Sequence, residues 1–136
     1  GELKAVGVLD NKEVETTILK TSGDAAKIKL IVDRREISAD GQDLSFVTIE
    51  VTDNDGILQP NAENRLEFDI SGPGVIAGVD NANIKDVDPY LATSRKAWHG
   101  RALVVIRSTK NAGTIKLSAG SLGLKNVKTE IVTVKR

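Results

Sequence analysis

The chain has 136 residues and carries no formal net charge, because 19 Lys and Arg are balanced by 19 Asp and Glu. The basic residues are scattered, whereas a nucleic-acid binder needs a clustered positive surplus, so we expect no nucleic-acid partner. Cys is absent, which excludes thiol catalysis, thiolate metal sites and disulfides. No stretch reaches the roughly 18 apolar residues of a membrane-spanning helix, so we expect no membrane insertion.

Apolar and polar residues alternate along most of the chain, as in strands that bury one face. Ile28, Leu30 and Val32 show this spacing, and β-branched residues fill many of the runs. The pattern predicts an all-β fold with a strand spacing typical of β-sandwiches. We expect nine strands, at about residues 2–9, 13–20, 26–33, 43–52, 65–71, 74–79, 101–108, 113–120 and 126–135. The longest irregular stretch is about 80–99.

The first two predicted strands form a hairpin across Asp10 to Lys12, and the polar segment 21–25 then looks like a linker. We therefore expect a seam between residues 1–22 and residues 23–136. Two strands cannot make a core, so the hairpin should pack on the following sandwich or belong to a preceding domain. The chain starts at Gly1 with a strand already under way, so we expect a piece of a longer polypeptide.

Three segments resemble known proteins. Residues 38–56, which read SADGQDLSFVTIEVTDNDG and are followed by Pro60, resemble bacterial immunoglobulin-like domains. Residues 72–81 (GPGVIAGVDN) and 97–108 (AWHGRALVVIRS) extend the match. Together they are similar to the C-terminal domain of glycoside hydrolase family 2 β-galactosidases. The opening GELKAVG and its hairpin resemble the last two strands of the small β-sandwich that precedes this domain.

This resemblance implies an immunoglobulin-like β-sandwich of the invasin and intimin type with an additional N-terminal hairpin. It implies a non-catalytic accessory domain of a retaining β-galactosidase, whose acid and nucleophile lie on a barrel domain absent from this chain. The expected partners are neighbouring domains of that glycosidase or a second subunit. The resemblance also implies a periplasmic or secreted bacterial protein.

The residues themselves offer little catalytic chemistry. A retaining glycosidase needs two positioned carboxyl groups, and Asp80, Asp86 and Asp88 share one irregular loop without a paired acid on a rigid element. His99 is the only histidine, so a histidine zinc site is excluded. The run from Asp53 to Gly56 is similar to the start of a calcium loop, but strands flank it where helices are required. We expect no catalytic residue, no metal and no cofactor.

Tyr90 and Trp98, with His99 adjacent, are the candidate sugar-binding residues. Aromatic rings pack on the C–H faces of pyranoses while their polar edges bond hydroxyls. A lone Trp in a sandwich is also commonly a packing residue. Two alternatives to the accessory domain therefore stay open: a carbohydrate-binding module that uses these aromatics, and a free-standing adhesin-type domain.

Overall fold

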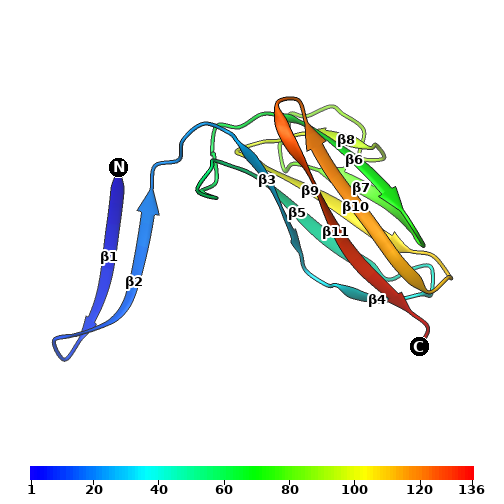
Figure 1. Cartoon of the computed structure of the whole chain (residues 1–136), viewed down its shortest axis with the longest axis horizontal. Coiled ribbons are helices and arrows are strands. Elements are labelled where there is room, and N and C mark those ends of the chain that lie inside the picture. Colours follow the sequence, from blue (N-terminus) through cyan, green and yellow to red (C-terminus); the bar gives the residue numbers. More distant parts are fainter.

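The computed structural model describes all residues, 1–136, and contains eleven strands and no helix (Figure 1). The strands are β1 (Glu2–Leu9), β2 (Lys12–Lys20), β3 (Lys27–Val32), β4 (Glu36–Ser38), β5 (Leu44–Thr52), β6 (Arg65–Ser71), β7 (Gly74–Asp80), β8 (Ser94–Lys96), β9 (Arg101–Ser108), β10 (Gly113–Ser121) and β11 (Leu124–Val134). The all-β prediction is confirmed. The chain forms no helix long and apolar enough to span a membrane.

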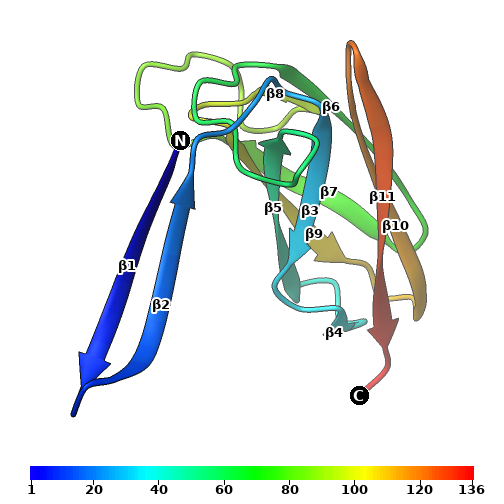
Figure 2. The same ribbon diagram turned by 60° about the vertical axis from the view of Figure 1, so that its left-hand side comes forward.

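Strands β1 and β2 make a two-stranded sheet of their own. Asp10 and Asn11 join them with φ angles of 50° and 60°, the left-handed pair that suits a two-residue hairpin turn. Every residue of both strands is exposed. The hairpin stands apart from the rest of the chain in both views (Figures 1 and 2). Of the two expected arrangements, packing of the hairpin on the following sandwich is not seen in this structure.

Residues 27–134 form two sheets that face each other. One has five strands in the order β4-β11-β10-β6-β8, and the other has four in the order β3-β5-β9-β7. All pairs are antiparallel except the edge pair of β4 with β11, which is parallel. Because the two sheets pack face to face, the inner face of each sheet is shielded from water.

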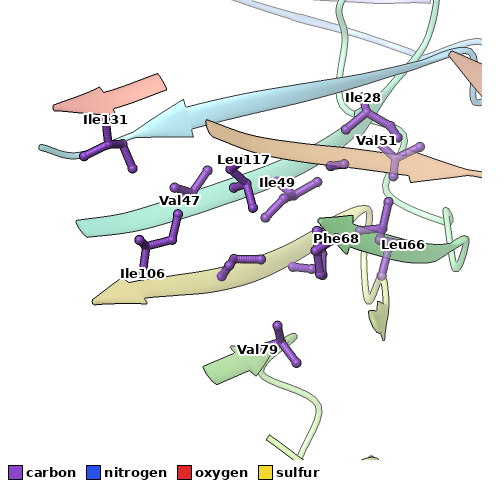
Figure 3. Packing of buried hydrophobic residues seen from close by; sticks show 14 of the residues in the cluster. Ile28, Val47, Ile49, Val51, Leu66, Phe68, Val79, Ile106, Leu117 and Ile131 are labelled. Carbon is purple, nitrogen blue, oxygen red and sulfur yellow. The ribbon is translucent and has the colours of Figure 1, made fainter. Parts of the chain in front are cut away.

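The core lies between the sheets and contains 17 buried apolar residues. Strand β5 shows how the sequence produces it: Val47, Ile49 and Val51 are fully buried and alternate with residues that point outward. On the facing sheet, Ile115 and Leu117 of β10 alternate in the same way. Figure 3 shows side chains from both sheets gathered in this single layer.

Two strands were missed by the sequence prediction, β4 and β8, each of three residues. Three residues are too few to display an alternating pattern, so only pairing to a neighbour defines them. Strand β8 interrupts the stretch 80–99 and pairs with β6 through Leu66 and Arg95. This pairing anchors the long loop that precedes it.

Candidate functional site

Trp98 lies at the start of a tight turn that fixes its backbone. Its N–H donates to the carbonyl oxygen of Arg101 at 2.9 Å, and the N–H of Arg101 donates back at 3.0 Å. His99 and Gly100 between them have φ angles of 50° and 75°. A Cβ atom on Gly100 would clash with the carbonyl oxygen of Gln59, so the turn requires glycine there. Trp98 is thus held by backbone geometry.

Two polar hollows meet at the Trp98 side chain, which is 36% exposed. Its indole packs edge to face against the His99 ring at a centroid distance of 4.3 Å. One hollow is lined by Pro60, Asn61, Glu63, Trp98 and His99. The other shares Glu63 and Trp98 and includes Arg65, Asn83, Asp88 and Lys96. Trp98 therefore lines both hollows, and His99 lines the first one.

Most charged side chains around these hollows are paired, with Lys85 as an exception. Lys96 Nζ lies 2.6 Å from Glu63 Oε2, and Arg65 Nη2 lies 2.8 Å from Asp88 Oδ2. The hydrogen bond from Lys96 holds the pKa of Glu63 below its usual range. Each of these two acids is therefore matched by a cation.

Arg95, which is almost fully buried, organises the loop between β7 and β8. Its guanidinium pairs with Asp86 at 3.2 Å and donates to the carbonyl oxygens of Val79, Asp88 and Pro89 at 2.8, 3.1 and 3.2 Å. A buried cation needs such partners to offset its desolvation. This network ties residues 79–89 to β8.

Tyr90 belongs to this network and not to the Trp98 hollows. Its ring centroid lies 5.3 Å from the Arg95 guanidinium carbon, within the range of a cation–π contact. Neither hollow that Trp98 lines includes Tyr90. Tyr90 is still 66% exposed, but the structure does not bring it into one cavity with Trp98. The predicted trio of aromatic residues is thus divided between two places.

Two of the three acids predicted in the long loop, Asp80 and Asp86, stabilise its backbone, whereas the third, Asp88, pairs with Arg65. Asp80 accepts the N–H groups of Asn81 and Ala82. Asp86 accepts the backbone N–H of Asp88 and the side-chain amide of Asn81, and the bond from the Asp88 N–H is the main cause of its lowered pKa. These are the contacts of loop-supporting residues.

Asp53, in the run that is similar to a calcium loop, also bonds backbone. Its Oδ1 accepts the N–H groups of Asp55 and Ile57, both at 2.9 Å, and its Oδ2 accepts that of Gly23 at 2.8 Å. These bonds hold the pKa of Asp53 below its usual range. The structure contains no cluster of three or more acidic or histidine side chains suited to a metal ion.

Several residues of the site were not predicted from the sequence. The sequence alone gives no sign that Arg95 is buried, because its burial depends on β8 and on the loop that folds over it. Asn61, Glu63 and Asn83 lie far from Trp98 in sequence. The fold brings them to it through the pairing of β6 with β8 and through backbone bonds such as that from Gly100 to Ala62. In the sequence, the only signal of the turn is Gly100, which directly follows Trp98 and His99.

Two mainly antiparallel sheets packed face to face define an immunoglobulin-like β-sandwich. Solved structures of similar shape have the same fold. A domain of intimin (D00-D0) superposes with a TM-score of 0.61 at 18% identity, covering 91% of this chain and 58% of that chain, and this shows the fold alone. The predicted fold class is confirmed. Residues 28–130 match the family model described as glycoside hydrolase family 2 C-terminal domain 5, and the chain belongs to that family.

Similar proteins are much longer than this chain. A β-galactosidase of Bacteroides ovatus is 42% identical over 125 residues, which is 92% of this chain and 15% of the relative. A β-glucuronidase of Formosa agariphila is 33% identical over 129 residues, 93% of this chain and 13% of the relative. A glycosyl hydrolase family 2 member from Bacteroides cellulosilyticus superposes with a TM-score of 0.93 at 41% identity, over 99% of this chain and 17% of that chain. The chain thus spans about one seventh of such curated relatives.

Proposed function

We propose that this chain is the accessory C-terminal part of a longer family 2 glycosidase that cleaves terminal β-galactosides. Membership of the family and the 42% identity to a β-galactosidase support this proposal. The acids around the candidate site and in the turn after β5, namely Asp53, Glu63, Asp86 and Asp88, are engaged in ion pairs or backbone hydrogen bonds. The hydrolytic acid and nucleophile would therefore be supplied by the rest of the protein.

The proposed role of the chain is to pack against neighbouring domains, and the exposed hairpin carries this proposal. Seven large apolar residues of β1 and β2 are exposed: Leu3, Val6, Val8, Leu9, Val14, Ile18 and Leu19. An isolated two-stranded sheet is marginally stable at best in water. We therefore propose that residues 1–22 are the last two strands of a preceding β-sandwich domain, which would cover these side chains.

The outer face of the four-stranded sheet offers a second apolar surface. Phe46 of β5 pairs with Val105 of β9, and Ile31 of β3 and Leu103 of β9 flank Thr48 in the next row. Phe46 is 42% exposed and Ile31 is 41% exposed. Free antiparallel sheets usually present polar residues on the solvent side. This face suits a further contact with another domain of the parent protein.

We also propose a second kind of partner and a cellular location for the parent protein. An exposed strand edge on the hairpin could instead pair with a second copy of the chain, which would give a homo-oligomer. Export of the parent to the periplasm or the exterior rests on the sequence resemblance alone. Cell fractionation of the native organism, with detection of the parent protein, tests that location.

A substitution in the hairpin tests the packing role. In the isolated chain Ile18 is already 47% exposed, so Ile18→Lys should leave the melting temperature unchanged. In the parent protein the same lysine would be buried without a partner, so the parent should lose thermal stability. The readouts are the melting temperature of both proteins and hydrolysis of a nitrophenyl β-galactoside by the parent.

The isolated chain, which serves as the control, should release no nitrophenol. The proposal of a β-galactosidase fails if the parent cleaves the matching β-glucuronide and not the β-galactoside. The packing role fails if Ile18→Lys leaves the parent as stable as the wild type.

A further inference from the structure

We propose that the two hollows on either side of Trp98 form one binding site for a neutral oligosaccharide. This inference goes beyond the packing role and does not depend on it. It departs from the sequence expectation, because Tyr90 takes no part. The site consists of Trp98 and His99 from the turn before β9, Asn61 and Glu63 from the loop before β6, and Asn83 and Lys96 around the β7–β8 loop.

The aromatic platform is held ready for a ligand. The Trp98 backbone is fixed by reciprocal hydrogen bonds with Arg101, and its indole is buttressed by the His99 ring. The backbone N–H of Gly100 also donates to the carbonyl oxygen of Ala62 at 3.1 Å, which ties the turn to the Asn61 loop. A preorganised site loses little conformational entropy when it binds. An indole that is one-third exposed can pack on the C–H groups of a pyranose ring.

Polar atoms without a protein partner surround this platform. His99 Nδ1 lies 3.3 Å from the carbonyl oxygen of Pro60 and can only donate to it, so in the neutral ring Nε2 is left to accept a hydrogen bond. The side-chain amide of Asn61 makes no hydrogen bond within the protein, although its backbone N–H donates to Gln59. In Asn83 the side-chain oxygen accepts the Lys85 N–H, so the NH₂ group is free to donate. Sugar hydroxyls can satisfy both donors and acceptors of this kind.

The size of the hollows points to more than one sugar ring. Their volumes are about 230 and 250 Å³, each below the roughly 300–1,000 Å³ of typical ligand pockets. Because Trp98 and Glu63 line both, a ligand lying across Trp98 can occupy both hollows. A disaccharide or a longer chain is therefore expected to bind better than a single sugar.

The charges favour a neutral ligand. Glu63, Asp86 and Asp88 each have a basic partner within 3.2 Å. Lys85 lines the second hollow with no ion pair, but it is exposed, and a solvent-exposed pair contributes only about 0–1 kcal/mol. The site therefore offers no buried unpaired cation to recognise a uronate.

Titration of the 136-residue chain with lactose, galactose and a galacturonic acid disaccharide tests the proposal. Trp98 is the only tryptophan, so its fluorescence reports the site directly. We expect a saturable change with lactose, a weaker one with galactose and none with the uronate. In ¹⁵N NMR spectra the amides of residues 61–63, 83–88 and 96–99 should shift together.

Asn61 is exposed and Asn83 is half-buried, and neither side chain belongs to the buried core, so both variants should fold. Asn61→Ala and Asn83→Ala should each weaken lactose binding about fivefold, the effect of one hydrogen bond. Asn54→Ala, which removes an exposed amide from a different loop, should bind as the wild type does. The proposal is overturned if no neutral disaccharide gives saturable binding, if the uronate binds better, or if both site variants bind lactose with wild-type affinity.

Discussion

The carboxylate of Asp53 accepts a 2.8 Å hydrogen bond from the backbone N–H of Gly23, 30 residues earlier in the chain. Gly23 in turn receives a 2.7 Å bond from the side-chain amide of Gln59 on its carbonyl oxygen. These are the first hydrogen bonds between the sandwich and the segment that leads from the hairpin. Asp53 fixes where the hairpin leaves the sandwich.

Removal of the Asp53 side chain should loosen this link. Asp53→Ala leaves the N–H groups of Gly23, Asp55 and Ile57 without their acceptor, and Asp53→Asn retains one acceptor oxygen. We expect the melting temperature to fall in the order wild type, Asn, Ala, with faster amide exchange at Gly23 and Ile57. Equal melting temperatures for all three proteins would contradict this role.

Gly72 should tolerate no side chain. Its φ is 89°, and an added Cβ would run into the carbonyl oxygen of Thr114 on β10. Gly56 is a matched control with φ of 81° and no atom within 4 Å of the added Cβ. We expect Gly56→Ala to cost about 1–2 kcal/mol of unfolding free energy, the penalty of the left-handed conformation. Gly72→Ala should cost clearly more, and equal losses in urea unfolding would refute the steric argument.

The Arg34–Asp43 pair should make stability depend on pH. Arg34 donates to both carboxylate oxygens at 2.7 and 2.9 Å, and the N–H of Ser38 donates at 2.7 Å. The bond from Arg34 is the main cause that holds the pKa of Asp43 well below its usual range. Because the folded pKa is lowered, the stabilisation is present above the unfolded pKa of about 3.9 and is lost as pH falls toward the folded pKa.

Melting temperatures of the wild type and Asp43→Asn between pH 7 and pH 2 test this linkage. The variant should be less stable at pH 7, and the difference should shrink below about pH 4. Arg34→Lys, which keeps the charge and loses the paired geometry, should fall between them. A difference that does not change with pH would show that the ionised carboxylate is not responsible.

Arg95 should control the order of the β7–β8 loop. Arg95→Met fills similar space but removes the cation that pairs with Asp86 and the donor to three carbonyl oxygens. We expect trypsin to cleave after Lys85 at least several times faster in this variant. Arg65→Met, which removes an exposed pair with Asp88, should change the rate little. Equal cleavage of both variants would argue against the buried network.

The sequence predicted the regular part of this protein and missed its irregular part for physical reasons. Alternating residues such as Val47 and Ile49 report burial locally, so nine strands and the hairpin turn at Asp10 were predictable. The environment of Arg95 depends on contacts between segments distant in the chain. For the same reason sequence could place Trp98 beside His99 but could not separate both from Tyr90.

Hydrogen–deuterium exchange of residues 2–20, compared between the isolated chain and the full parent protein, tests the central proposal most directly. If the hairpin completes a preceding domain, its amides should exchange rapidly in the isolated chain and slowly in the parent. The sandwich amides of β5 and β9 should be protected in both and provide the internal reference. Equally rapid exchange of the hairpin in both proteins would contradict the packing role.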